Sequence, residues 1–421
     1  MGKILVLAEK PSVGRDIARV LGCKNEKNGY IEGSKYIVTW ALGHLVTLAD
    51  PETYDKKYKS WEMNDLPILP KELKIVVIKK TSKQFNTVKA QLNRNDVDEV
   101  VIATDAGREG ELVARWIIEK AHIKKPIKRL WISSSTDKAI KEGFTKLRDG
   151  RDYNNLYYSA IARAEADWIV GINATRALTT KYNASLSCGR VQTPTLAIIS
   201  KREDEIRNFK PKDYYTLDVL TEKGGSYLKL SWHDRNNSTS TFNKDKIEKI
   251  KKKVNNKDLK IVDVKKSNKK KYSPALYDLT ELQRDANKIF GYSAKETLSI
   301  MQKLYEHHKV LTYPRTDSRY LTDDIVDTLK DRIKAVNTSE YSKVCMKLLK
   351  TKIKPNKSFV DNSKVSDHHA IIPTEERVFL GDLSDKERKI YDLVVKRFLS
   401  VLCPPFEYEQ TTIKGVCEGE M

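Results

Sequence analysis

The first 150 residues alternate short apolar runs with helical patterns, and this alternation limits the folds open to the chain. The apolar runs lack interleaved polar residues, so both faces of the expected strands are buried. Buried strands separated by helices are typical of a parallel sheet, and we expect an α/β domain here. The expected strands are 3–8, 73–78, 99–104 and 129–132, and the expected helices are 12–21, 82–93, 110–121 and 136–150.

The remaining residues predict mainly helical structure with one β-rich insertion. A long helical pattern without proline covers 153–182, and a turn at Cys188-Gly189 precedes a helix that ends near Asn208. Further expected elements are antiparallel strands at 215–220 and 227–232, helices at 279–290 and 294–307 joined at Gly291, and an extended stretch at 310–314. The expected domains are 1–150 (α/β), 151–212 (helical), 213–275 (β-rich), 276–403 (helical) and 404–421.

The chain is strongly basic, with 78 Lys and Arg against 57 Asp and Glu and a net charge of +21. Such a balance favours a polyanionic partner, most often nucleic acid, although a lysine-rich surface or an AT-rich genome would give the same count. Thirteen of the lysines lie between Lys244 and Lys271, among four acidic residues. That run either contacts DNA or forms a solvated helix face, and we favour the solvated face.

Export and membrane insertion are not indicated. The apolar run at 4–8 ends at Glu9 and is too short for a signal peptide, and no run approaches the roughly 18 apolar residues of a membrane span. The five cysteines are scattered without a CxxC pair, which argues against a zinc ribbon or a disulfide framework. We expect a cytoplasmic protein without membrane contact.

Acidic residues follow two of the expected strands. Glu9 comes directly after the first strand and Asp105 directly after a later one. Because the carboxyl ends of parallel strands share one edge of a sheet, these carboxylates are expected to be neighbours. Glu109 and Glu111 follow at the start of a helix. Carboxylates and water suit Mg²⁺, but acids are also ordinary at turns and at helix N-termini.

The same segments resemble the TOPRIM domain, the Mg²⁺-binding fold of type IA topoisomerases, bacterial primases and some nucleases. The resemblance rests on residues 8–12 (AEKPS) and 103–111 (ATDAGREGE). The usual pattern has an acid, an Asp-x-Asp pair and a Glu, but Gly107 stands where the second Asp belongs. This departure favours one loosely held Mg²⁺. The ligands it leaves are Glu9, Asp105 and Glu109, completed by water and DNA phosphate.

Residues 311–318 (LTYPRTDS) resemble the active-site tyrosine motif of type IA topoisomerases, most of all the topoisomerase III branch. A tyrosine oxygen that attacks a phosphodiester forms a phosphotyrosine, which conserves the bond energy and needs no ATP for rejoining. The free phenol of Tyr313 has a pKa of about 10 and needs activation. Arg315 lies two residues on in an extended stretch and so shares its side. Its charge lowers the phenol pKa and binds the developing charge.

Two further catalytic residues follow from the resemblance. Lys10 matches the lysine that protonates the leaving 3′ oxygen, and Glu9 can join proton transfer if burial raises its pKa. Residues 367–373 (DHHAIIP) match an element in which the histidine corresponding to His368 lies near the scissile phosphate. A structural histidine in the core or on the surface is the alternative, and the adjacent His369 is the weaker candidate.

DNA-binding residues are implied in three places. Residues 187–195 (SCGRVQTPT) match a family element in which free backbone N–H groups and an arginine grip phosphate, although a plain turn and helix start is the alternative. On the helix at 153–182, Arg163 and Asp167 match family residues that bind the DNA strand, with a salt bridge within the helix as the alternative. Trp168 and Arg176 lie about 80° apart around the same helix and could pair an aromatic ring with a cation. Trp61 matches a family tryptophan that lies along DNA, and a place in the core is the alternative for each tryptophan. The implied DNA-binding residues are Ser187, Gly189, Arg190, Gln192, Arg163, Asp167, Trp168, Arg176 and Trp61.

The resemblance implies ATP-independent breakage, passage and rejoining of single-stranded DNA through a 5′-phosphotyrosine. It also implies relaxation of negative supercoils or decatenation, with Mg²⁺, no nucleotide cofactor and a monomeric enzyme. It runs from Lys3 to about Ile413, whereas relatives are longer, so we expect a multidomain toroidal architecture that is incomplete, with 404–421 beginning the returning gate segment. The rivals are a TOPRIM nuclease or primase that does not use Tyr313, and a non-catalytic remnant that binds single-stranded DNA.

Overall fold

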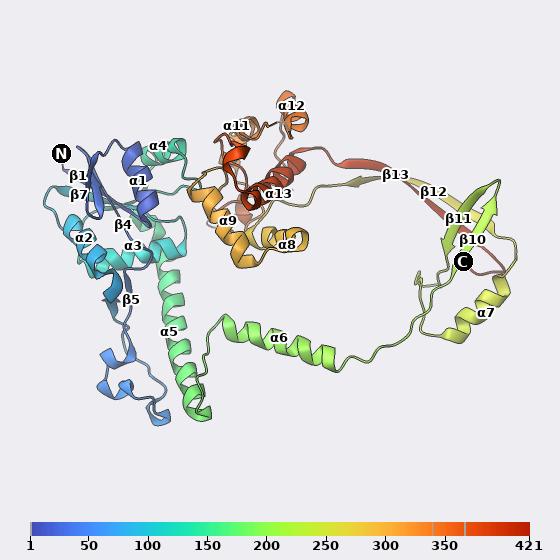
Figure 1. Ribbon diagram of the computed structural model, residues 1–421, viewed down its shortest axis with the longest axis horizontal. Coiled ribbons are helices and arrows are strands. Elements are labelled where there is room, and N and C mark those ends of the chain that lie inside the picture. The colour runs from blue at the N-terminus through green and yellow to red at the C-terminus, as the bar shows by residue number, and fades with distance from the viewer. Residues whose placement is uncertain (1, 339, 366–367) are drawn as a thin grey trace. The chain divides into compact units, whose positions relative to one another are not determined.

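The computed structural model describes residues 2–338, 340–365 and 368–421. Its contacts divide the chain into two compact units, each formed from two separate segments (Figure 1). Unit 1 comprises residues 1–193 and 273–403, and unit 2 comprises residues 194–272 and 404–421. Among the described residues, no helix has the length and apolar character needed to cross a bilayer.

Unit 1 contains a seven-stranded sheet in the order β2-β3-β4-β1-β7-β8-β9. Its strands are β1 (Lys3–Ala8), β2 (Asn25–Lys27), β3 (Tyr30–Glu32), β4 (Tyr36–Trp40), β7 (Val97–Ala103), β8 (Ile127–Arg129) and β9 (Arg148–Asp149). The four central strands β4, β1, β7 and β8 are parallel, and the outer strands join them antiparallel. The expected parallel sheet is therefore confirmed at its centre.

Two details of the strand prediction were wrong. Residues 75–77 form β6 (Ile75–Val77), which pairs with β5 (Val46–Leu48) in a separate two-stranded sheet. The strand expected at 129–132 ends at Arg129. An apolar run shows that a strand is buried but does not say which strand it pairs with, so the pattern could not separate the two sheets.

Both faces of the central sheet are buried. Leu5 and Leu7 of β1 pack into one hydrophobic core, and Val6 and Ala8 pack into a second core on the other face. Successive side chains of a strand point to opposite faces, which explains the uninterrupted apolar run. The helices of this part are α1 (Pro11–Val20), α2 (Ser82–Leu92), α3 (Arg108–Lys120), α4 (Asp137–Thr145) and α5 (Asn154–Tyr182).

The second segment of unit 1 is helical around its own core, as expected. Its helices are α8 (Leu279–Phe290), α9 (Ala294–Glu306), α10 (Asp323–Val326), α11 (Leu329–Ala335), α12 (Ser342–Lys350) and α13 (Asp385–Leu402). Gly291 ends α8 in the left-handed region (φ 72°), and the Ser293 side chain caps α9, so the joint predicted at this glycine is confirmed. Short 3-10 helices cover Pro51–Thr53, Lys56–Lys59, Met63–Asp65, Lys79–Thr81, Gly150–Tyr153, Asn362–Lys364 and Leu380–Asp382.

Unit 2 is built from two antiparallel strand pairs and one packed helix. Its elements are β10 (Asp218–Lys223) with β11 (Ser226–Ser231), α7 (Lys244–Val254), β12 (Lys260–Lys271) with β13 (Phe406–Val416), and most of α6 (Gln192–Arg207). The lysine run thus divides between α7 and β12. The expectation of a single solvated helix face was wrong, because β13 supplies a pairing partner that local patterns could not show.

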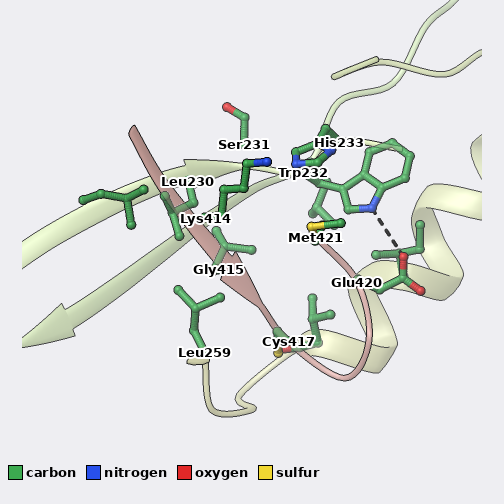
Figure 2. A pocket seen from close by; sticks show the side chains of 15 residues that line it. Leu230, Ser231, Trp232, His233, Leu259, Lys414, Gly415, Cys417, Glu420 and Met421 are labelled. Atoms are coloured by element: carbon green, nitrogen blue, oxygen red, sulfur yellow. Dashed lines mark hydrogen bonds between the residues drawn. The ribbon is translucent and has the colours of Figure 1, made fainter. Parts of the chain in front are cut away.

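A small cavity of about 70 Å³ lies between β11, α7 and the end of β13 (Figure 2). Trp232 packs with Ile247 and Ile250 beside it, and its indole N–H donates to Glu420 Oε2 at 3.4 Å. The cavity lies beside the small hydrophobic core of unit 2.

Candidate active site

Glu9 and Asp105 meet at the carboxyl edge of the sheet. Strands β1 and β7 are parallel neighbours in which Ala8 lies opposite Ala103, so the residues that follow them emerge side by side. The backbone N–H of Asp105 donates to Glu9 Oε2 at 3.0 Å. The structure therefore brings together these two residues of the predicted metal site.

The two carboxylates share a poorly solvated site. Burial raises the pKa of Glu9 to about 7, and the charge of Asp105 adds to the effect. Burial likewise raises the pKa of Asp105. Two close, buried carboxyls favour a proton or a cation between them. Their oxygens suit Mg²⁺, which is commonly held by one or two carboxylates together with water and substrate phosphates.

The predicted third ligand, Glu109, is not brought to this pair. Its Oε1 atom lies 3.5 Å from Arg163 Nη1, and its side chain is 59% exposed. Among the described residues, no group of three or more acidic, His or Cys side chains could hold a metal ion. The donor set therefore fits one Mg²⁺ held by Glu9 and Asp105, with the remaining positions left to water and phosphate.

A buried ion pair, which the sequence did not reveal as part of the site, supports Asp105. Arg129 and Glu111 are both fully buried, and Arg129 Nε donates to Glu111 Oε2 at 3.0 Å. The same guanidinium donates to the carbonyl oxygens of Thr104 at 2.8 Å and Asp105 at 2.7 Å. A Cβ atom at Gly110 would stand 2.1 Å from that Asp105 oxygen, so only glycine permits this close approach.

Tyr313 lies against the same carboxylates. Its hydroxyl donates to Asp105 Oδ2 at 3.1 Å, and its backbone N–H donates to the carbonyl of Ser133 at 3.2 Å. Its side chain is largely buried, with 9% exposed, and its ring meets the Tyr305 ring edge to face. The predicted nucleophile and the predicted metal ligands thus form one site, although they are far apart in the sequence.

The resting environment holds Tyr313 protonated. Burial raises the pKa of its phenol, and the charges of Asp105 and Glu9 raise it further. The charge of the exposed Arg315 acts in the opposite direction, as the sequence suggested, but burial and the carboxylates outweigh it. Activation of Tyr313 therefore requires a change in its surroundings, such as neutralisation of the carboxylates.

Lys10 forms an ion pair with Glu306, a partner that the sequence did not indicate. Its Nζ atom lies 2.7 Å from Glu306 Oε1, which also accepts from Gln302 Nε2 at 2.8 Å. Burial disfavours the charged amine, but Glu306, Asp105 and Glu9 together outweigh burial and raise the pKa of Lys10. The amine is therefore protonated at neutral pH and can serve as a proton donor.

His368 stacks on the nucleophile. Its ring lies 4.1 Å from that of Tyr313, at an interplanar angle of 27°. Within the described residues neither ring nitrogen has a partner in hydrogen-bond geometry, although a backbone group of Ala106 is close enough to raise its pKa slightly. Burial and the charge of His369 lower the pKa of His368 to about 3, so the ring is neutral. Its neighbour Asp367 lies outside the described residues.

His369 does not share this position, because its Nδ1 lies 2.7 Å from the carbonyl of Ala370 in the core. The segments that carry Tyr313 and His368 are held together by hydrogen bonds. Thr316 Oγ1 donates to the carbonyl of His368 at 2.8 Å, and the Thr312 N–H donates to the carbonyl of Ile372 at 3.0 Å. The geometry favours His368 over His369, in agreement with the sequence.

The exposed charged side chains Arg163 and Asp167 of α5 form ion pairs with residues outside this helix. Arg163 lies beside Glu109 of α3, and Arg190 Nε donates to Asp167 in a short hydrogen bond. The alternative of an Arg163–Asp167 salt bridge is thus not formed. Gln192 Nε2 donates to Ser187 Oγ at 3.1 Å, and the Gly189 N–H donates to Thr193 Oγ1 at 3.1 Å.

The structure does not pair Trp168 with Arg176, which corrects that expectation. The Trp168 indole N–H donates to the carbonyl of Ala49 at 2.9 Å, and its ring meets Tyr54 edge to face. Arg176 is buried, and its guanidinium lies 5.0 Å from the centre of the Trp61 ring. Spacing on one helix could not show these partners, because Ala49, Tyr54 and Trp61 all lie in the segment between β5 and β6. Trp61 remains 43% exposed and available to a base.

Comparisons with known proteins agree with this arrangement. Residues 4–135 match the Toprim domain family, and residues 151–421 match the DNA topoisomerase family. The chain is 66% identical over 414 residues to DNA topoisomerase 3 of Bacillus cereus, covering 98% of this chain and 56% of that protein. It is 63% identical over 421 residues to DNA topoisomerase 3 of Bacillus subtilis, covering 100% and 57%.

The fold also resembles a solved structure. Full-length topoisomerase I from Thermotoga maritima superposes with a TM-score of 0.67 at 24% sequence identity. The match covers 99% of this chain and 66% of that one, and it shows the likeness of the fold alone. The chain spans little more than half the length of the curated relatives it matches.

Proposed function

The chain belongs to the type IA DNA topoisomerase family, and we propose that it breaks and rejoins single DNA strands through Tyr313 without ATP. The observation that carries the proposal is the hydrogen bond from the Tyr313 hydroxyl to Asp105, beside Glu9 and Lys10. A buried tyrosine that lies against two carboxylates and a lysine has the groups that phosphodiester transfer requires.

These residues supply both the proton acceptor and the proton donor that the cleavage step needs. The Tyr313 oxygen attacks the phosphorus and passes its proton to Glu9 or Asp105, whose raised pKa values make them able to accept it. The bond from phosphorus to the 3′ oxygen breaks, and Lys10 gives that oxygen a proton. The products are a 5′-phosphotyrosine and a free 3′ hydroxyl, and rejoining is the same transfer in reverse.

Glu9 and Asp105 would hold Mg²⁺, which supplies positive charge for the scissile phosphate and the neighbouring carboxylates. Neutral His368 can donate to a phosphate oxygen, since its nitrogens lack partners within the described residues. Arg315 is exposed and free to bind the charge that develops on the phosphate. Arg315 and His368 are thus proposed to stabilise the transferred phosphate, and Glu9 and Asp105 to hold the metal ion and accept the proton.

The DNA strand would follow the exposed polar face between α3, α5 and the start of α6. Arg163 and Arg190 are each held by a protein carboxylate there, and a phosphate can replace that carboxylate. Ser187 and Gln192, whose side chains are hydrogen-bonded to each other, supply further polar groups beside Gly189 at the start of α6.

A denaturing adduct assay tests the proposal. Labelled single-stranded oligonucleotide is mixed with the protein and Mg²⁺, and the reaction is stopped in SDS. We expect a covalent adduct for the wild type, none for Tyr313→Phe, and an unchanged yield for Tyr305→Phe, a matched control because its ring is the adjacent buried tyrosine. Cleavage without an adduct would instead indicate a nuclease, and binding without cleavage would indicate a non-catalytic DNA-binding protein.

Strand passage is a separate part of the proposal. Relaxation of negatively supercoiled plasmid, with Mg²⁺ and without nucleotide, measures it directly. Wild type is expected to shift the topoisomer distribution, and Tyr313→Phe is expected to leave it unchanged. A wild type that forms the adduct but relaxes no plasmid would restrict the proposal to cleavage and rejoining.

A further inference from the structure

The ribbon formed by β12 and β13 is exposed on both faces and is the longest strand pair of unit 2 (Figure 1). Almost all residues of both strands are exposed, so their side chains are accessible to a ligand. The register is unbroken from Asp263 to Lys271, and residues directly opposite each other share a face. The two faces can therefore be assigned residue by residue.

The face called here the paired face carries lysines that are neutralised within the ribbon. Lys270 lies opposite Glu407, and their side chains form an ion pair at 2.8 Å. Lys266 forms an ion pair with Glu409 at 3.0 Å. Both lysines of this face in residues 265–271 thus have acidic partners, and the face offers little net charge to an anion.

The other face, called here the open face, differs in its chemistry. Its residues between 265–271 and 406–412 include no acid, and its lysines form no ion pair within the described residues. The rings of Phe406 and Tyr408 stack on it with centroids 5.8 Å apart, and they are 67% and 40% exposed. The open face consists of Lys265, Ser267, Lys269, Lys271, Phe406, Tyr408, Gln410 and Thr412.

We propose that the open face of the β12–β13 ribbon binds single-stranded nucleic acid, with bases stacked on Phe406 and Tyr408 and phosphates on Lys269 and Lys271. Lys269 lies opposite Tyr408, and Lys271 opposite Phe406, so each ring has a cation beside it. Exposed aromatics interleaved with unpaired cations are the pattern of proteins that bind single strands without sequence preference. A duplex offers no free base faces and would use only the charges.

The inference rests on the proposed function only where it takes the single strand bound by the open face to be DNA. The site lies in unit 2, whereas Tyr313 and its partners lie in unit 1. It would give the chain a second contact with a strand, separate from the one that is cleaved. The adduct assay on wild type tests the proposed function, and binding by Tyr313→Phe protein tests the ribbon, so the two can fail independently.

The test compares two double variants in the 421-residue chain carrying Tyr313→Phe. Lys269→Ala/Lys271→Ala removes two lysines from the open face, and Lys266→Ala/Lys270→Ala removes two from the paired face of the same strand. Both lose the same net charge, so non-specific attraction predicts equal effects. A third variant, Phe406→Leu/Tyr408→Leu, removes the rings, and thermal melting confirms that all three remain folded.

The readouts are photo-cross-linking of a 5-iodouridine oligonucleotide, mapped by mass spectrometry, and the salt dependence of oligothymidylate binding. We expect cross-links at Phe406 or Tyr408 that fall roughly fivefold or more in the open-face variant and persist in the paired-face variant. The salt slope should fall by about 1.4 only in the open-face variant, and Phe406→Leu/Tyr408→Leu should weaken oligothymidylate binding.

Several results would overturn the inference. These are equal losses in the two lysine variants, no cross-link in residues 404–412, or full binding by the leucine variant. A duplex of the same length that cross-links to the rings as efficiently as the single strand would also overturn it, because stacking needs unpaired bases.

Discussion

Replacing Glu111 by Gln tests whether the buried ion pair between Glu111 and Arg129 holds Asp105 in position at the carboxyl edge of the sheet. The carboxylate of Glu111 accepts from Arg129 Nε at 3.0 Å and from Arg115 Nε at 2.9 Å, and it is fully buried. Glu111→Gln keeps the shape but leaves the guanidinium of Arg129 as a buried cation without an anion. Breaking a buried pair from one side costs about 3–5 kcal/mol.

The cost converts into a measurable shift in melting temperature. With an unfolding entropy of roughly 2.1 cal/mol/K per residue, a cooperative unit the size of unit 1 should melt about 4–7 °C lower. Differential scanning calorimetry measures the shift. The matched control is Arg151→Gln, which breaks an exposed pair with Asp149 at 2.9 Å and should leave the melting temperature unchanged.

Function should respond together with stability. Arg129 also donates to the carbonyl of Asp105 at 2.7 Å, so a displaced guanidinium loosens the loop that carries this carboxylate. Glu111→Gln should therefore lower the adduct yield at temperatures where it is still folded. A variant that melts within about 1 °C of the wild type and forms adduct normally would refute both the energetic role and the positioning role of the pair.

Two further predictions concern Glu9 and Gly107, at the edge of the sheet that carries the proposed metal ligands. Burial raises the pKa of Glu9 from 4.5 to about 7, so without Mg²⁺ the folded chain keeps a proton that the unfolded chain releases, and stability from this group is lost as pH rises through that window. As the pH rises from 4.5 to about 7, the melting temperature of the wild type should therefore fall relative to that of Glu9→Gln. A difference in melting temperature that stays constant across this pH range would contradict the burial of Glu9. Gly107 has an extended backbone (φ 175°) open to any residue, so Gly107→Asp should add a ligand and lower the Mg²⁺ concentration for half-maximal adduct formation; an unchanged requirement would argue against a metal site at this edge.

Local sequence patterns were sufficient to predict β1 and β7, the strands that position Glu9 and Asp105. The apolar run of β1 and the acids that follow β1 and β7 predicted the contact between Glu9 and Asp105, because parallel order fixes which strand ends meet. β4 was missed although it pairs with β1. Its residues (YIVTW) are β-branched and aromatic, a composition that could have identified the strand. Its place in the sheet depends on a partner far away in the sequence.

The position of Glu109 could have been anticipated from helix geometry. Residues two apart on a helix point about 200° apart, so Glu109 and Glu111 cannot both face the sheet. Leu112 and Val113 are buried beside Glu111, which shows that the inward face of α3 contains Glu111 and excludes Glu109. The contact of Tyr313 with Asp105 could not be derived this way, since it joins segments 208 residues apart that carry no shared pattern.

The residues proposed to act on DNA share a resting arrangement. Arg190 is paired with Asp167 and Arg163 lies beside Glu109, so in each case a protein carboxylate occupies the place proposed for a phosphate. Exchanging one anion for another at the exposed Arg190 costs little, because the pair is already solvated. The proposed binding of a strand beside α5 would therefore leave the buried site undisturbed.

Tyr313 differs from these pairs because its partner is buried. Its hydroxyl is held by Asp105, one of the two carboxylates proposed to hold Mg²⁺. Burial raises the pKa of Tyr313 most, and the charge of Asp105 raises it further. A cation on Asp105 would remove that second contribution, while the opposing charge of Arg315 remains. Metal binding and activation of the nucleophile are thus coupled through one carboxylate. On the proposed function, DNA binding and cleavage would then be separable steps, with binding set by exposed pairs and cleavage set by the state of Asp105.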